Sequence, residues 1–305
     1  MYPTLGTELR VSLAGSFRPK EFQDLERGVA VEIERLENVL SAFRPNSDLA
    51  RWRTTGELTA PELARVLAAA LHWQQRSAGA FTVNAGVASA IWSAFEKANQ
   101  EPPDSILEDL ISALTVSPFT IETDPKTSTP KVTRTADCSL VNLNAIAKGF
   151  VVDAAAQWLL AHGAERAMVN IGGDIAHCGS EPRERVGIED PAQPFDNAPP
   201  LATIALCNGA IATSGSSRRG WQIANRWYSH VIDPRTARPV DHIASASVLA
   251  PSAMDADAIA TVLSVIGEPE RGTFAQQLPS DVGFCVVDAN YRVHTNSVWD
   301  TAVLR

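Results

Sequence analysis

Asp257 and Thr261 lie four residues apart in the segment Met254-Asp-Ala-Asp-Ala-Ile-Ala-Thr261. On a helix, side chains at this spacing share one face and can converge on a single point. A carboxylate and a hydroxyl are hard oxygen ligands, which suit Mg2+ better than softer metals. In the alternative interpretation, Asp255 and Asp257 only complement the dipole at the start of a helix. The pair therefore makes this segment a candidate magnesium site.

The run Ala145-Ile-Ala-Lys-Gly149 is a second candidate. We expect it where a strand passes into a helix, because free backbone groups there can face an anion or offer a carbonyl oxygen to a metal. Lys148 could meet a phosphate as a compact positive charge. The alternative is a surface lysine beside a glycine that is required for packing.

Two segments of small residues could approach a phosphate closely. Ile171-Gly-Gly-Asp174 follows a predicted strand, and its glycines allow a ligand to come near the backbone. Thr213-Ser-Gly-Ser216, with Arg218 and Arg219 behind it, offers hydroxyl and amide groups in a predicted loop. An ordinary tight turn explains either segment equally well.

His230 precedes Asp233 by three residues in Tyr228-Ser-His-Val-Ile-Asp-Pro-Arg-Thr236. A histidine in this setting could take part in proton transfer. The alternative is a structural histidine beside a turn, since Asp-Pro-Arg-Thr is a typical turn sequence.

The elements that must position these residues alternate irregularly, without a repeating strand–helix–strand period. This favours an α+β fold with mixed or antiparallel sheets and packed helices. Predicted helices and strands cover residues 8–14 (strand), 21–43 (helix), 59–78 (helix, with a capping box at Thr59 and Glu62), 104–114 (short helix within a surface excursion over 99–130), 145–161 (helix), 166–171 (strand), 202–207 (strand), 252–266 (helix) and 282–298 (two strands), with 180–200 loop-like at both ends.

Composition excludes several classes of protein. The 305 residues suit one large domain or two joined lobes, and a net charge of -9 argues against a general nucleic-acid binder. No two of the four cysteines form a CxxC pair, so a thiolate zinc site is not expected. There is no long apolar run for a membrane span and no export signal in MYPTLGTELRV. We therefore expect a cytoplasmic protein, or a periplasmic one if an export signal has been removed.

The order of these motifs resembles the ApbE family, the FAD:protein FMN transferases. Three further matches precede them along the chain: Gly6-Thr7, Phe43-Arg-Pro-Asn-Ser-Asp-Leu49 and Gly79-Ala-Phe81. Eight elements in family order cover nearly the whole chain. The resemblance implies a T-fold-like, two-lobed α+β core and a single domain over residues 1–305.

The resemblance also implies roles for individual residues. Mg2+ would be bound by Asp257, Thr261 and the backbone carbonyl of Ala145, with His230 and Asp233 at the catalytic position. The metal would neutralise the pyrophosphate of FAD while a Thr or Ser hydroxyl of an acceptor flavoprotein attacks the FMN phosphorus and AMP leaves. The implied flavin-nucleotide site is lined by Lys148, Thr213, Ser214, Gly215, Ile232 and Phe81.

The chain departs from the family pattern at three places. Asn142-Leu-Asn144 replaces Asp-Leu-Gly, Thr82 replaces an aspartate, and Ala237 replaces a glycine. The loss of two carboxylates near the nucleotide is expected to change the affinity for Mg2+ or to leave FAD bound without efficient transfer. The alternatives are therefore an FAD pyrophosphatase that releases FMN and AMP, or an FAD-binding protein without catalysis. A redox flavoenzyme is disfavoured because there is no GxGxxG element.

Overall fold

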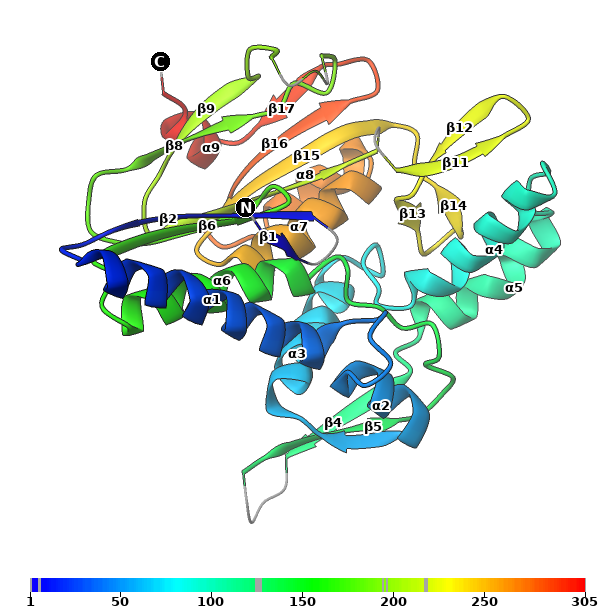
Figure 1. Ribbon diagram of the computed structural model, residues 1–305. Helices are drawn as coiled ribbons and strands as arrows, with labels where there is room; N and C mark the ends of the chain where they lie inside the picture. Colours follow the sequence, from blue (N-terminus) through cyan, green and yellow to red (C-terminus); the bar gives the residue numbers. More distant parts are fainter. Residues whose placement is uncertain are drawn as a thin grey trace.

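An antiparallel sheet forms the middle layer of the structure (Figure 1). The computed structural model describes residues 2–4, 7–123, 128–193, 195, 197–216 and 219–304, and within them this sheet has eight strands. Their spatial order is β1 (Tyr2–Thr4), β2 (Thr7–Ala14), β6 (Arg166–Ile171), β7 (Asp174–Gly179), β10 (Gly209–Gly215), β15 (Ile243–Ala250), β16 (Gly283–Asp288) and β17 (Val293–Thr295). Every neighbouring pair is antiparallel, which confirms the predicted α+β class.

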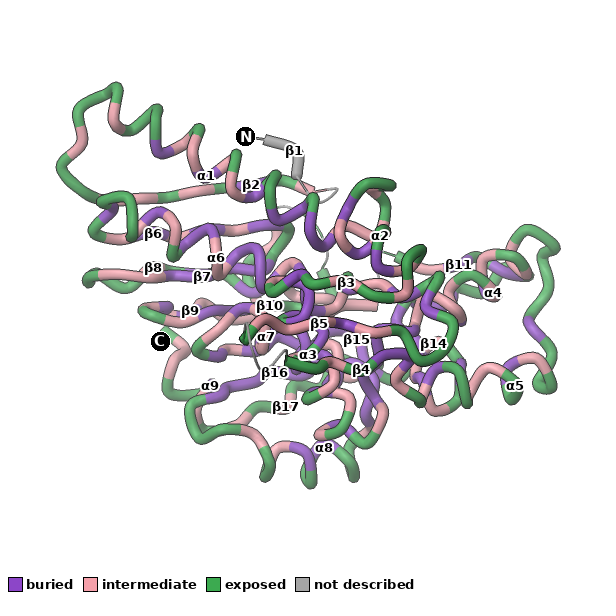
Figure 2. Tube along the Cα trace, turned by 90° about the horizontal axis from the view of Figure 1, so that it is seen from below, coloured by how far each residue is buried: buried purple, intermediate pink, exposed green. Residues whose placement is uncertain are grey.

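The two faces of the sheet are covered differently, because successive side chains of a strand point to opposite sides. Small residues such as Ala176 and Ala212 belong to the main core, which lies under α1 (Pro19–Leu40), α6 (Ala147–Ala161) and α7 (Ala253–Val265). Their neighbours Ile175 and Ile211 face the other way. That face carries β8 (Glu184–Ile188), β9 (Ala202–Leu206) and α9 (Ser297–Ala302). Buried residues gather where α6 and α7 lie against the sheet (Figure 2).

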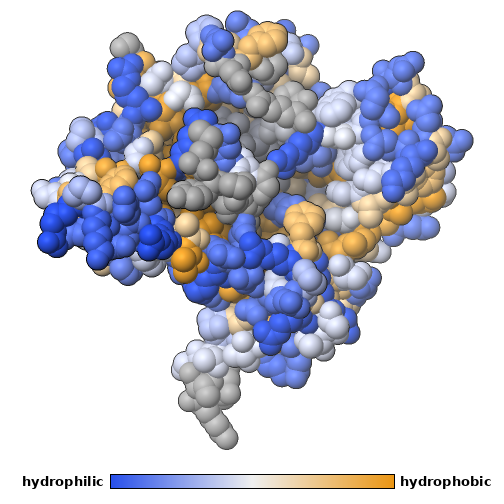
Figure 3. Space-filling view, viewed as in Figure 1, coloured by the Kyte–Doolittle hydropathy of each residue, from blue (hydrophilic) through white to orange (hydrophobic). Residues whose placement is uncertain are grey.

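An arm extends from this body and has an apolar core of its own (Figure 1). It consists of α4 (Ala85–Lys97), α5 (Asp104–Thr115), the hairpin of β11 (Gly220–Ile223) and β12 (Arg226–Ser229), and the pair β13 (Ile232–Asp233) and β14 (Arg238–Pro239). The Trp92 ring lies 6.0 Å from that of Trp221 and 5.1 Å from that of Tyr228. Hydrophobic surface also follows the edge of the arm that α5 forms (Figure 3). This aromatic core fixes the strand that leads into His230.

A third, smaller unit lies below the body in the view of Figure 1. It is a sheet in the order β3 (Glu57–Thr59), β5 (Pro130–Arg134) and β4 (Phe119–Thr123), with α2 (Asp48–Thr55) and α3 (Pro61–Arg76) beside it. The remaining helix is α8 (Glu268–Ala275). Among the residues that the structure describes, no helix is both long enough and apolar enough to cross a membrane.

The capping box predicted at Thr59 is wrong. Thr59 belongs to β3, and α3 begins after Ala60 without a side-chain cap. The carboxylate of Glu62 instead pairs with Arg35 of α1, 27 residues away in sequence. A cation from another helix therefore takes the place of the local backbone donor.

Two other predictions need correction. The surface excursion over 99–130 contains β4 as well as a short helix. Helix α1 ends at Leu40, and Phe43 is 84% exposed. The segment 180–200 is loop-like at both ends, as predicted, within the described residues, and its middle forms strand β8, which pairs with β9. Strands β4 and β8 each pair with the next strand along the chain, and this pairing, more than their own residues, decides their conformation.

Candidate active site

Helices α6 and α7 meet at their N-terminal ends and cap one another. The Asp153 carboxylate of α6 accepts hydrogen bonds from the backbone N–H groups of Ala253 (2.8 Å) and Met254 (3.0 Å). In return, the Asp257 carboxylate of α7 accepts one from the Gly149 N–H (3.4 Å). N–H groups in the first turn of a helix have no partner within it, so each helix supplies what the other lacks. The two motifs predicted from the sequence are thus brought together.

Gly149 allows this close approach because it has no side chain. A Cβ atom at this position would lie 2.1 Å from the carbonyl oxygen of Ala253. The segment before α6 is a turn and not the predicted strand, since β5 ends at Arg134 and no strand intervenes within the described residues. Two helix ends in backbone contact, and not a strand–helix junction, therefore position Lys148.

We expect Gly149→Ala to destabilise the protein by about 1–3 kcal/mol or more, the usual effect of overpacking a close contact. Differential scanning calorimetry measures the loss. Gly272→Ala in α8 is the matched control, because nothing lies within 4 Å of its Cβ position, and there the substitution should be neutral or slightly stabilising. Equal melting temperatures for the two variants would contradict this account of Gly149.

Lys148 joins two buried carboxylates. Its Nζ contacts the carboxylate of Asp174 and lies 3.9 Å from Oδ1 of Asp257. Asp174 is 1% exposed and Asp257 6%. Burial raises the pKa of both carboxyl groups; the charge of Asp174 raises that of Asp257 further, while Lys148 opposes the shift. Burial acts to lower the pKa of Lys148, but the two aspartates outweigh it and raise the value.

Asp174 is a site residue that the sequence analysis did not single out. Its segment was noted for the two glycines, whose value lies in backbone access. The signal was the acidic residue that ends the segment and begins β7. A strand that starts beside α6 directs this carboxylate to Lys148.

The oxygens near Asp257 suit a hard divalent cation such as Mg2+. Thr261 is half-buried one turn after Asp257 on α7. Ser264 donates its hydroxyl to the carbonyl one turn back, whereas the Thr261 hydroxyl has no hydrogen-bond partner among the described residues. The Ala145 carbonyl likewise accepts no backbone hydrogen bond in the described part of the chain. The predicted ligand set therefore fits the metal that the resemblance implies.

Carboxylates alone would not hold such an ion here. Within the described residues, no group of three or more His, Cys, Asp and Glu side chains is arranged to bind a metal. A cation at Asp257 would depend on neutral oxygens of the protein and on water, and on substrate oxygens once the nucleotide is bound, as is common for Mg2+.

The segment Thr213–Gly215 is a strand and not the predicted loop. It ends β10 and pairs with β15 through Ser247, Ala246 and Ser245. Small residues are typical of turns, but a long neighbouring strand provides the ladder that decides the conformation. The Thr213 hydroxyl lies 2.8 Å from that of Ser247. Two positions of the sequence motifs, Gly6 and Arg218, lie outside the described residues.

His230 lies between β12 and β13, with its side chain exposed at the surface. Its Nδ1 is 3.2 Å from the carbonyl oxygen of Arg219, which selects the tautomer with the proton on Nδ1. Surrounding protein lowers the pKa of His230 by desolvation. The hydrogen bond to Arg219 opposes this effect, and the charges of Arg219 and Lys148 add to it. The imidazole is therefore neutral at pH 7 and presents Nε2 as a base.

The other predicted site residues have structural partners. The Asp233 carboxylate accepts hydrogen bonds from the backbone N–H (2.9 Å), Nε (2.9 Å) and Nη2 (2.8 Å) of Arg235. The same guanidinium also pairs with Glu270 of α8. This network holds the turn after His230. Ile232 is 5% exposed in the core of the arm and Phe81 is 1% exposed in the main core, so neither presents its side chain to solvent.

At two of the three departures from the family pattern the side chain makes a turn hydrogen bond, whereas nothing in the described structure explains the third, Ala237. The Thr82 hydroxyl accepts a hydrogen bond from the Asn84 N–H (3.2 Å), and the Asn142 side-chain oxygen accepts one from the Asn144 N–H (3.3 Å). Both are turn interactions that an aspartate also makes, here without its charge. Ala237 adopts a left-handed φ of 56°, a conformation that is unfavourable for residues other than glycine.

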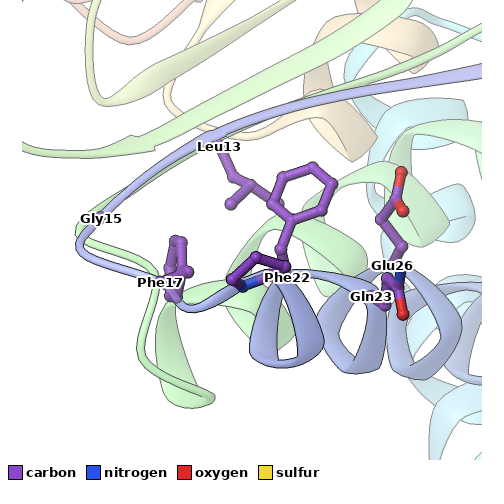
Figure 4. A pocket seen from close by; sticks show the side chains of 7 residues that line it. Leu13, Gly15, Phe17, Phe22, Gln23 and Glu26 are labelled. Atoms are coloured by element: carbon purple, nitrogen blue, oxygen red, sulfur yellow. The ribbon is translucent and has the colours of Figure 1, made fainter.

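Two surface cavities lie elsewhere, beside the first turns of α1. One, of about 520 Å3, is lined by Leu13, Phe17 and Phe22 among others (Figure 4). The second, of about 460 Å3, shares Phe17 and includes Trp158 and His162. Neither is lined by a predicted site residue, so they do not mark the candidate active site.

Comparison with known proteins assigns the chain to a family. An ApbE family model matches residues 5–286. The FAD:protein FMN transferase of Haemophilus influenzae is 30% identical over 249 residues, covering 78% of this chain and 71% of the relative. That of Vibrio cholerae is 30% identical over 291 residues, covering 91% and 84%.

Solved structures agree with this assignment. The flavin transferase ApbE from Vibrio cholerae superimposes with a TM-score of 0.76 at 25% identity, covering 99% of this chain and 97% of that one. The apbe protein of Thermotoga maritima shares the fold, with a TM-score of 0.82 at 21% identity, covering 99% and 97%. On the match over residues 5–286, the chain belongs to the ApbE family.

Proposed function

We propose that this protein is an Mg2+-dependent FAD:protein FMN transferase. One observation carries the proposal: Lys148 at the start of α6 contacts Asp174 at the start of β7 and lies 3.9 Å from Oδ1 of Asp257 on α7. A carboxylate that can hold a metal, a cation that can face the phosphates and a base such as His230 can together support phosphoryl transfer. The relatives from Haemophilus influenzae and Vibrio cholerae are named FAD:protein FMN transferases.

In this proposal Asp257, Thr261 and the Ala145 carbonyl would hold Mg2+, which when bound would neutralise charge on the FAD pyrophosphate. Nε2 of His230 takes the proton of a Thr or Ser hydroxyl on the acceptor flavoprotein. The hydroxyl oxygen forms a bond to the FMN phosphorus, the bond from that phosphorus to the bridging oxygen breaks, and AMP leaves. Asp233 keeps His230 in place by fixing the following turn through Arg235.

The nucleotide is proposed to lie along the end of β10, beside Thr213, Ser214 and Gly215, and within reach of Lys148. Ile232 and Phe81 support this site from the two apolar cores. Because the proposed base comes from the arm and the metal ligands come from the body, we propose that residues 1–305 function as one domain.

The decisive experiment is incubation with FAD, Mg2+ and a candidate acceptor that carries a Thr or Ser site. Mass spectrometry of the acceptor should then show covalent FMN, with one AMP released for each FMN attached. AMP release with an unmodified acceptor would replace the proposal by an FAD pyrophosphatase. An absence of AMP with every acceptor, despite FAD binding, would replace it by a non-catalytic FAD-binding protein.

We expect the protein to bind FAD in preference to NAD, because the site is proposed to recognise a flavin nucleotide through β10 and Lys148. Isothermal titration calorimetry with each nucleotide at the same Mg2+ concentration measures the difference. AMP alone is the control for recognition of the adenosine half. Similar affinities for NAD and FAD would contradict flavin recognition.

A further inference from the structure

Two buried carboxylates share a single neighbouring cation at this site. Within the described residues, Lys148 is the only Lys, Arg or His with a nitrogen within 4.0 Å of the carboxylates of Asp174 and Asp257. When both carboxyl groups are ionised, the three groups together carry two negative charges and one positive charge. A buried carboxylate without a partner is strongly destabilising, so the fold depends on how these charges are balanced.

Lys148 interacts more strongly with one of the two aspartates than with the other. Lys148 forms a hydrogen-bonded ion pair with Asp174, whereas Asp257 has only the ammonium at 3.9 Å and the Gly149 N–H at 3.4 Å. Asp257 therefore keeps most of its capacity to accept a second positive partner. The Lys148 side chain is 28% exposed, and its flexible stem lets the ammonium shift between the two carboxylates.

We propose that Lys148 is a built-in counterion, which holds the Asp174–Asp257 pair together until a divalent cation takes over charge compensation at Asp257. This inference rests on the metal site of the proposed function. It makes Lys148 a positioning residue for Asp257, in addition to any contact with the nucleotide. It also means that the acidic pair is formed before the metal arrives.

The test is thermal unfolding of Lys148→Met, without FAD or acceptor, in EDTA and in millimolar MgCl2. We expect the variant to melt roughly 5–10 °C below the wild-type protein in EDTA, because two buried carboxylates lose their cation. Mg2+ should restore most of this loss, since a ligand that binds only the folded state stabilises it. The wild-type melting temperature should rise less with Mg2+ than that of the variant, because Lys148 already balances part of the charge at Asp257.

Lys131→Met is the matched control. Lys131 pairs with Glu57 at 2.6 Å, but the two side chains are 43% and 61% exposed. A surface pair of this kind contributes little, so its loss should shift the melting temperature by no more than roughly 2 °C. The shift should be the same in EDTA and in Mg2+.

The double variant Lys148→Met with Asp257→Asn removes one carboxylate together with the cation. It still leaves Asp174 buried without a cation, so it should melt above Lys148→Met in EDTA but below the wild-type temperature, and it should not respond to Mg2+. If Lys148→Met does not fold in either buffer, a folded double variant supports the counterion role and an unfolded one overturns it.

A wild-type melting temperature for Lys148→Met in EDTA would overturn the inference, and so would a loss that Mg2+ does not restore. These measurements involve neither FAD nor FMN transfer. If the variants behave as expected while no acceptor is ever flavinylated, the inference stands and the proposed function fails. If the wild-type protein flavinylates an acceptor but the melting temperature of Lys148→Met does not depend on Mg2+ in this way, the proposed function stands and the inference fails.

Discussion

Asp257→Ala should lower Mg2+-dependent AMP release by roughly 10²–10³-fold or more, the range for losing one group that stabilises developing charge. Asp257 is the only charged residue in the proposed ligand set, and no other aspartate or glutamate completes a metal cluster within the described residues. Thr261→Val should have a smaller effect, because a neutral hydroxyl contributes less to binding a hard cation. AMP release at several Mg2+ concentrations measures both variants.

Asp255→Ala is the matched control for the dipole interpretation. Asp255 lies in the first turn of the same helix, where its carboxylate accepts hydrogen bonds from Trp73 Nε1 (2.9 Å) and the Ser252 hydroxyl (2.9 Å). We expect this variant to melt at a lower temperature but to keep its requirement for Mg2+. If Asp255→Ala and Asp257→Ala lost activity equally, the helix terminus would matter and the ligand assignment would be wrong.

His230→Ala should slow FMN transfer by roughly two to four orders of magnitude, the usual contribution of a general base. The affinity for FAD should change little, because the imidazole acts on the attacking hydroxyl and not on the nucleotide. Single-turnover measurement of acceptor flavinylation gives the rate, and titration calorimetry gives the FAD affinity.

The pH profile of the wild-type enzyme provides a second readout on His230. A base is active when deprotonated, so kcat/KM should rise with pH. The midpoint should lie below the ordinary value for histidine, because desolvation lowers the pKa of His230. This rise of kcat/KM with pH should be absent from His230→Ala. If the variant instead shows a lower melting temperature and weaker FAD binding together with the lost activity, His230 only braces the turn at Asp233.

The sequence predicted the parts of the site that depend on local geometry. Asp257 and Thr261 share a helical face because of their spacing alone, and the predicted helix over 252–266 contains α7 (Ala253–Val265). Helix α6 likewise begins within the predicted run, so Lys148 was placed correctly on a helix.

The remaining features depend on residues that are distant in sequence. The pairing of Lys148 with Asp174 requires β7 to run beside α6, and the strand at Thr213 requires β15 as its partner. The core of the arm brings Trp92, which precedes β10 in the sequence, into contact with Tyr228, which follows β10. Periodicity describes the faces of an element but not its neighbours, so these contacts could not be deduced from it.

The close approach at Gly149 has a consequence for how this protein can diverge. A side chain there meets backbone atoms of Ala253 and Met254, and no substitution elsewhere can remove a backbone atom. By contrast, a side chain at Gly28 of α1 would meet the Trp158 ring at 2.2 Å, which a smaller residue at position 158 would relieve. A substitution at position 28 can therefore be compensated by a second mutation. Position 149 can change only if the axes of α6 and α7 move apart.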